Sequence, residues 1–308
     1  DDVNATYWNP AGLINIERDE ISLMHSNYFA NIANFNYISY AKKIDSESAM
    51  GFSLIRFGVD DIMDTTQLID NQGNIDYNRI EMFSAADYAF IFSYAKRNKL
   101  LNLNFGVNAK IIRRIIGDFA NSWGFGFDLG VQHENKNGWK FGLMARDITT
   151  TYNSWSFDED RLNDIQNALE GENQEIPEKN EISIPKIQLG ISKEIYLSSD
   201  YSMLAAIDLF MLFEQTNDII STSFASINPS LGLEFAYSEL VYLRLGLGNF
   251  QNELQFDSTT ELSFQPNFGI GFNLQDIEVN YAFTDIGNQS AALYSNIFSL
   301  KFNLNLLR

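Results

Sequence analysis

The chain has 308 residues, a formal net charge of −19 at pH 7, and no cysteine. Nucleic acids are bound mainly through Lys and Arg, so this charge argues against a nucleic-acid partner. The absence of cysteine excludes disulfides, thiolate metal sites and thiol catalysis. No apolar run reaches the length of about eighteen residues that a transmembrane helix needs, yet aromatic residues make up 14% of the chain.

The first segment, residues 1–19, does not have the pattern of a strand. It contains Asn9, Pro10 and Gly12, and an Asn-Pro pair followed by Gly predicts a turn. The first residue is Asp1 rather than Met, and we expect a secretory signal peptide to precede it in the gene.

From residue 20 onward, apolar side chains alternate with polar or small ones along almost the whole chain. In the stretch 123–131, large apolar residues occupy every odd position and small or polar residues every even one. Such alternation predicts a strand with one apolar face. The predicted strands are 20–29, 33–42, 48–58, 86–96, 100–113, 119–133, 138–148, 184–196, 200–213, 228–238, 240–249, 262–274, 276–285 and 294–306.

The predicted connections alternate between short and long. The short ones lie near residues 43–47, 97–99, 134–137, 197–199, 239 and 275, and the long ones are 59–85, 149–183, 214–227 and 250–261. Outer-membrane barrels have short periplasmic turns and longer outer loops, and an even number of long antiparallel strands. The sequence therefore predicts an all-β fold, a transmembrane antiparallel β-barrel of about fourteen strands.

This prediction places the protein in the outer membrane of a Gram-negative bacterium, with lipid around a barrel domain of residues 20–308. Residues 1–19 would then form a plug or hatch inside or beneath the barrel, or an ordinary periplasmic lead-in. A soluble β-sandwich or propeller is the alternative fold. The long strands and the lack of a blade repeat argue against it.

Signatures of catalysis and of metal binding are weak. The two histidines are His25 and His133, and no His-Glu-x-x-His zinc pattern is present. A Ser-His-Asp triad through His25 stays open. The loops 59–85 and 149–183 are acidic but lack the full EF-hand spacing, which favours solvated loops, and residues 159–170 have the spacing of a short helix. We assign no catalytic residue, metal site or cofactor, and we expect no enzyme activity.

Three stretches together resemble a known family. Residues 7–13 resemble the Asn-Pro-Ala segment of the FadL-like superfamily of long-chain fatty-acid transporters, and within it the PorV/PorQ family associated with type IX secretion. Residues 124–131 with 142–147, and the closing hairpin 279–287 with 297–302, agree with that family. The proposed plug motif is Trp8, Asn9, Pro10, Ala11 and Gly12.

The resemblance implies a fourteen-stranded barrel with an N-terminal hatch. PorV-like members bind the C-terminal domain of secreted or surface-exposed cargo and dock to the type IX translocon, to the attachment machinery or to a surface adhesin. Secretion members tend to have His before the motif Trp, where this chain has Tyr7. The candidate partner-binding residues in the outer loops are Asp60, Asp64, Tyr77, Tyr152, Trp155 and Phe157.

Two other functions stay open at this stage. One is a FadL-like transporter of hydrophobic small molecules, which would need an apolar site in the lumen and a movable hatch. The other is an outer-membrane hydrolase that acts on lipid, which would require His25 to be essential.

Overall fold

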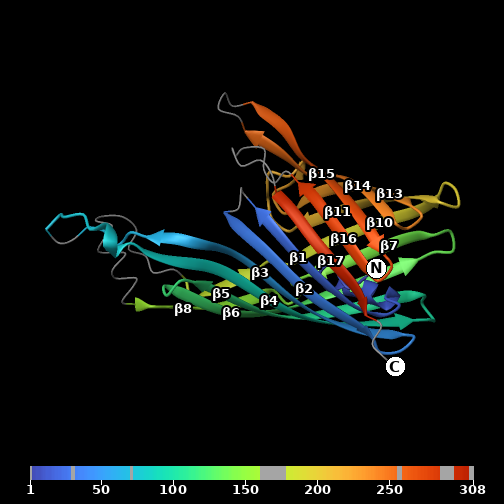
Figure 1. Ribbon diagram of the computed structural model, residues 1–308, viewed down its shortest axis with the longest axis horizontal. Helices are drawn as coiled ribbons and strands as arrows, with labels where there is room; N and C mark the ends of the chain where they lie inside the picture. The colour runs from blue at the N-terminus through green and yellow to red at the C-terminus, as the bar shows by residue number, and fades with distance from the viewer. Residues whose placement is uncertain are drawn as a thin grey trace.

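The computed structural model describes residues 2–28, 32–69, 72–159, 178–254, 259–284 and 295–304. Almost all of them lie in one antiparallel sheet that curves round and closes on itself (Figure 1). The strands are β1 (Asp19–Tyr28), β2 (Ala33–Lys43), β3 (Ser48–Asp64), β4 (Glu81–Asn98), β5 (Leu103–Ile116), β6 (Ala120–Glu134), β7 (Trp139–Arg146), β8 (Thr151–Phe157), β9 (Asn180–Ser183), β10 (Lys186–Tyr196), β11 (Tyr201–Leu212), β12 (Ile220–Ser221), β13 (Ser226–Tyr237), β14 (Val241–Leu254), β15 (Thr260–Leu274), β16 (Ile277–Thr284) and β17 (Ser295–Leu304).

The barrel is closed because β1 pairs with both β2 and the last strand, β17. β7 and β8 both pair with β6 and form two halves of one barrel strand. β10 and β9 pair with those two halves and form the next barrel strand, while the two-residue β12 lies beside β13. The barrel therefore has fourteen strands, as the sequence predicts. Closure joins the first strand to the last, which rules out the sandwich and propeller alternatives.

The two faces of the sheet differ in chemistry, because successive side chains of a strand point to opposite sides. On β6, Trp123, Phe125 and Phe127 point outward and are largely exposed. The alternate residues Gly124, Gly126 and Asp128 face the lumen. The same alternation on the other strands gives the barrel an apolar outer wall and a lumen of mostly small or polar residues, apart from an apolar stretch on β1–β4. Among the described residues, no helix is long and apolar enough to cross a membrane.

Several predicted strands end earlier than the real ones. β3 continues to Asp64 and β4 begins at Glu81, so the two ends of the predicted loop 59–85 form a projecting two-stranded ribbon, with a bulge between Val59 and Ile62. β8 and β9 lie within the predicted loop 149–183. Strand pairing thus continues beyond the region that the apolar alternation marks. The helix expected over 159–170 lies almost wholly outside the described residues.

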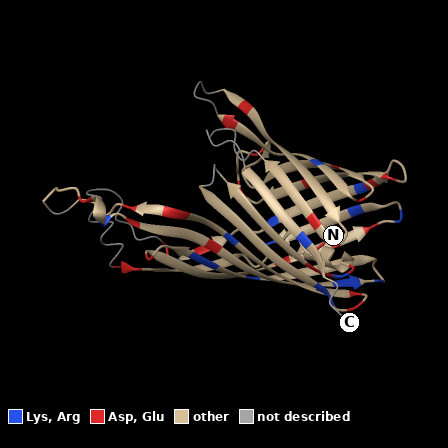
Figure 2. Ribbon diagram, in the orientation of Figure 1, with Lys and Arg blue, Asp and Glu red and all other residues tan. Residues whose placement is uncertain are grey.

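The N-terminal segment forms a plug inside the barrel, at the end with short turns (Figure 1). It consists of α1 (Ala5–Trp8) and the 3-10 helix η1 (Pro10–Asn15). A second 3-10 helix, η2 (Tyr77–Arg79), lies in the connection between β3 and β4. Acidic and basic residues occur together at the short-turn end of the barrel (Figure 2).

The plug packs against one side of the lumen, the wall made by β2–β6. The buried side chains of the plug meet alanines there rather than large residues. The cluster comprises Val3, Ala5, Leu13, Ile14, Ile16, Ala41, Ala49 and Ala95.

Glycines bring the plug still closer to this wall. A Cβ atom at Gly106 would overlap with the backbone of Pro10 and Ala11, and one at Gly130 would overlap with the Asn9 side chain. On the opposite wall, a Cβ at Gly232 would meet nothing nearer than Ala206 Cβ, at 4.0 Å. The wall is therefore shaped to the plug on one side only.

This asymmetry predicts different effects of one added methyl group on the two walls. Gly106→Ala should force the plug away from β5 and destabilise its seat by about 1–3 kcal/mol, the usual cost of overpacking. Gly232→Ala should leave the plug in place. Hydrogen–deuterium exchange of the plug amides measures both variants, and equal protection in the two would contradict the packing described here.

Candidate functional site

Asn9 fixes the plug to the wall and explains the Asn-Pro-Ala motif. Its Oδ1 accepts a hydrogen bond from the backbone N–H of Ala11 (3.1 Å), which caps η1, and Pro10 occupies the first turn of that helix. Its Nδ2 donates to the carbonyl oxygens of Leu143 (3.1 Å) and Val131 (3.4 Å) on β7 and β6. One side chain thus caps a helix and binds two strands.

Two wall residues hold the end of α1. Arg146 Nη2 donates to the carbonyl oxygens of Tyr7 (2.9 Å) and Trp8 (3.4 Å), and its guanidinium lies 4.9 Å from the centre of the Tyr7 ring. Asn108 Nδ2 donates to the carbonyl oxygen of Thr6 at 3.0 Å. These bonds satisfy carbonyls that the end of a helix leaves without partners.

The first residues of the plug are anchored to the strands where the barrel closes. The Asp2 carboxylate lies 3.2 Å from Lys301 Nζ on β17, and Glu20 on β1 accepts a hydrogen bond from the backbone N–H of Val3 at 2.8 Å. Burial raises the pKa of Asp2, while Lys301 and the backbone N–H of Asn4 lower it, and the net pKa lies below its ordinary value. Asp2 is therefore ionised at neutral pH and keeps the ion pair.

A buried cluster of charges lies behind the plug. Lys110 Nζ is 2.6 Å from Asp128 and also pairs with Asp147, whose backbone N–H donates to Asp128 at 2.9 Å. Asn108 donates to Asp128 at 3.2 Å, and Thr151 donates to Asp147. Buried charges are tolerated when they are paired in this way, and the loss of one partner is costly.

This cluster braces an interruption of the barrel wall. Residues 147–150 separate β7 from β8, and both Asp147 and Thr150 have left-handed backbone angles (φ 54° and 57°), which are uncommon for residues other than glycine. At the same level, Ile184 and Pro185 separate β9 from β10. The strand ladder is therefore broken on both neighbouring barrel strands. We call this place the wall break.

Apolar side chains line the lumen above the plug on β1–β4. Tyr37, Ile55 and Ile91 form a buried cluster, against which Tyr7 of the plug packs. Further toward the end with long connections, Tyr28, Phe35 and Phe57 form a trio with ring centroids 6.2–6.5 Å apart. We call these three residues the aromatic patch. The Phe57 side chain is 39% exposed, so the patch is open to the lumen.

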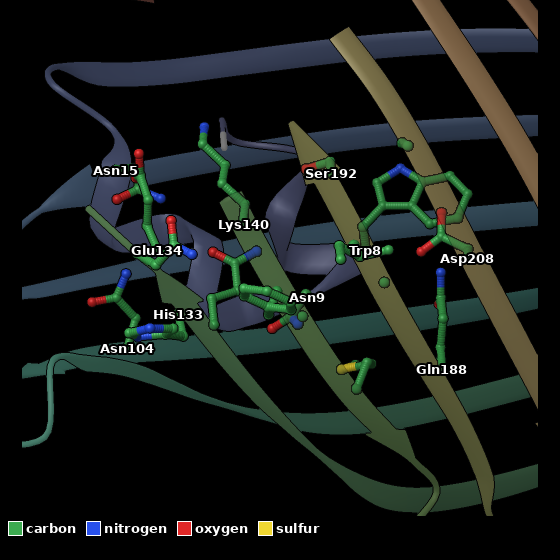
Figure 3. A pocket seen from close by; sticks show the side chains of 18 of the residues that line it. Trp8, Asn9, Asn15, Asn104, His133, Glu134, Lys140, Gln188, Ser192 and Asp208 are labelled. Atoms are coloured by element: carbon green, nitrogen blue, oxygen red, sulfur yellow. The ribbon is translucent and has the colours of Figure 1, made fainter. Parts of the chain in front are cut away.

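On the other side of the plug, a cavity of about 670 Å³ remains between the plug and the wall of β6, β7, β10 and β11. The Trp8 side chain projects into it and is 60% exposed, while its neighbours in the plug are mostly buried. Figure 3 shows the Trp8 indole on the side of the cavity where Gln188 and Asp208 lie. The plug thus fills only part of the lumen.

The residues of the proposed plug motif lie together in the structure. Pro10, Ala11 and Gly12 are buried between the plug and the wall, Asn9 binds the strands, and Trp8 faces the cavity. Motif residues therefore have two roles, since four of them hold the plug and one contacts the open space.

The six candidate partner-binding residues do not form one site, and the expected loop position is wrong for five of them. Asp60 and Asp64 belong to β3, where Asp60 pairs with Arg56 (2.7 Å) and Asp64 accepts from Thr66 (2.7 Å). Tyr77 begins η2 and is strongly exposed.

The remaining three candidates, Tyr152, Trp155 and Phe157, belong to β8. Trp155 and Phe157 stack at 6.2 Å, and Trp155 Nε1 donates to Glu181 at 3.0 Å. β3 extends beyond its predicted limit and β8 lies within a predicted loop, because strand pairing continues in both places. Expected loop residues are therefore strand residues.

His25 lies on the outer face of β1, and Nδ1 is 2.7 Å from Asn36 Oδ1 on β2. This is its one polar contact within the described part of the chain, so no carboxylate orients the ring as a triad would require. In the same described ranges, no group of three or more His, Cys, Asp or Glu side chains is placed to hold a metal ion.

The plug-binding residues Asn108 and Arg146 and the ion cluster of Lys110, Asp128 and Asp147 were not singled out as site residues from the sequence. The available signal was a charged or amide side chain at a lumen-facing position of a strand. That signal alone does not tell which strands the plug meets.

Comparison with known proteins gives matches among solved structures. The toluene transporter TodX of Pseudomonas putida aligns over 98% of this chain and 93% of its own, with a TM-score of 0.62 and 13% identity. The toluene transporter TbuX of Ralstonia pickettii (TM-score 0.55, 10% identity, 99% and 94% covered) and a FadL homologue of Pseudomonas aeruginosa (0.52, 10%, 98% and 94%) also align. The chain has the fold of the FadL-like outer-membrane barrels.

The searches of family models and of curated proteins found no match. The solved structures named above are transporters or homologues of one, and they share the barrel fold that the superfamily resemblance implies. They give no support to the more specific PorV/PorQ assignment, which stays a prediction.

The contacts of Arg146 predict that it keeps the plug in place. Arg146→Ala removes two hydrogen bonds and a ring contact, a loss of about 1–2 kcal/mol, and should increase the population with a released plug roughly tenfold. Chymotrypsin cleavage after Tyr7 should then accelerate by a similar factor.

The matched control is Arg113→Ala, since Arg113 lies over Trp123 on the outer face, 4.9 Å from its ring centre, and does not touch the plug. If cleavage is as slow in Arg146→Ala as in this control, the role of Arg146 is refuted.

Proposed function

We propose that this chain is an outer-membrane channel that admits small hydrophobic molecules. The observation that carries the proposal is the aromatic patch, an apolar surface in the lumen of a plugged barrel. Support comes from the fold shared with the toluene transporters TodX and TbuX. The apolar outer wall fits a position in the outer membrane of a Gram-negative bacterium.

In this account, a hydrophobic molecule enters from the end with long connections and binds at Tyr28, Phe35 and Phe57. Burial of an aromatic ring against these side chains releases free energy of about 25 cal/mol per Å² of apolar area. The Tyr7 ring and the buried cluster of Tyr37, Ile55 and Ile91 close the lumen below the patch on the β1–β4 side. The plug would therefore stop direct passage on this side of the lumen.

The wall break offers a way out of the lumen at the side. Backbone groups at the membrane interior must be paired or must face a water-filled space, and at residues 147–150 the strand pairing is interrupted. The ion cluster of Lys110, Asp128 and Asp147 satisfies polar groups on the lumen side. A small shift of this segment would open the wall next to the lumen, so that an apolar molecule could leave into the membrane.

Uptake of radiolabelled toluene by bacterial cells that express the chain tests the proposal. Phe57→Gln removes an exposed ring from the patch and should weaken toluene binding about five- to tenfold, which corresponds to about 1 kcal/mol of lost burial. Uptake at low toluene concentration should fall by a similar factor.

Tyr77→Gln is the control, because Tyr77 is an exposed aromatic residue in the connection outside the barrel. It should leave uptake unchanged. If neither the parent chain nor the control raises toluene uptake above that of cells without the protein, the channel function is wrong. If Tyr77→Gln instead abolishes co-purification of a secreted protein, the cargo-binding prediction gains support.

A further inference from the structure

The cavity beside the plug differs in chemistry from the aromatic patch. We propose that it is a binding site for a small neutral polyhydroxylated molecule, of the size of a mono- or disaccharide. This goes beyond the proposed channel for hydrophobic molecules, because an apolar molecule would leave most polar groups of the cavity without partners. The volume of about 670 Å³ lies within the usual range for small-molecule sites.

Amide side chains dominate the polar lining. Asn104, Gln132 and Gln188 come from three strands, β5, β6 and β10, and Asn15 comes from the plug. An amide offers both donors and an acceptor, and a hydroxyl group likewise donates and accepts. Several amides around one space can therefore bind several hydroxyls of one molecule.

Some of these groups are available for a ligand. Within the described ranges, the Gln132 amide and the Ser192 hydroxyl have no hydrogen-bond partner, although both line the cavity. The Asn104 Oδ1 accepts from Arg97 Nε (3.1 Å), and its Nδ2 has no acceptor among the described residues. The Asp208 carboxylate accepts a hydrogen bond from the Gln188 side chain, and its remaining lone pairs can accept hydrogen bonds from hydroxyls.

Trp8 adds a flat apolar surface to this polar lining. Its indole is 60% exposed inside the barrel, whereas Ala5, Leu13 and Ile14 of the same plug are buried. The C–H face of a sugar ring can cover such a surface while its hydroxyls reach the surrounding amides. The combination of one exposed indole and several amides thus fits a molecule with an apolar face and a polar rim.

The charges of the cavity argue for a neutral ligand. Arg97, Lys136 and Lys140 line it together with Glu134 and Asp208, so neither sign dominates. Arg97 donates to Asn104 and to Asn15 (3.3 Å), and Lys136 lies at the turn after β6. The cavity therefore has no electrostatic potential of a single sign that would attract a strongly charged molecule.

Saturation-transfer NMR on the whole protein tests the site, with maltose and glucose as probes and a detergent without a sugar headgroup. The parent chain should show saturable binding of at least one of the two sugars. Trp8→Ala should abolish it, and Gln188→Ala should weaken it about tenfold, as expected for the loss of one or two hydrogen bonds.

Trp139→Ala is the matched control, because Trp139 faces outward on β7 beside Lys193 and does not line the cavity. It should bind as the parent does. The proposal is overturned if neither sugar binds, if Trp8→Ala binds as well as the control, or if benzoate or benzylammonium binds this cavity more tightly than the sugars.

Toluene uptake measured on the same variants separates the two proposals. Normal toluene uptake without sugar binding would refute the sugar site alone. Sugar binding that depends on Trp8, in a chain without toluene uptake, would support the site and refute the hydrophobic channel.

Discussion

The close contact between the plug and one side of the barrel determines the shape of the lumen. It depends on missing side chains, since Gly106 lets the plug backbone approach and Gly130 leaves room for the Asn9 side chain. Ala41, Ala49 and Ala95 receive the apolar residues of the plug. Interiors pack densely, so a wall of larger residues would have pushed the plug to the middle. The one-sided position leaves the cavity on the other side and exposes Trp8 to it.

The lumen consequently has two surfaces of different chemistry. The aromatic patch lies above the plug on β1–β3 and is apolar, while the cavity beside the plug is rich in amides. The wall break and its ion cluster lie close to the plug-binding residues, because Asn108 binds both Thr6 and Asp128. A movement of the plug would therefore act directly on the paired charges that brace the break.

Much of the fold follows from the sequence, because period-two alternation and the succession of short and long connections are local signals. The wall break could not be predicted from the sequence, because residues 147–150 have the composition of a loop. The lumen-facing positions also change from even-numbered residues on β7 to odd-numbered residues on β8. The ion cluster joins Lys110 on β5, Asp128 on β6 and Asp147 in the wall break. The strand register that brings these three side chains together cannot be predicted from any one segment of the sequence. The plug motif was visible, but the side of the lumen to which it binds was not.

The one-sided position of the plug in the lumen is tested most directly by thiol labelling. Because the chain has no cysteine, an introduced thiol is the single labelling site. Ser39→Cys places a thiol at a fully buried position of the wall beneath the plug, and Ser192→Cys places one in the cavity. With a small water-soluble thiol reagent, we expect rapid labelling at position 192 and very slow labelling at position 39. Equal rates at the two positions would contradict a plug that is seated on one side of the barrel.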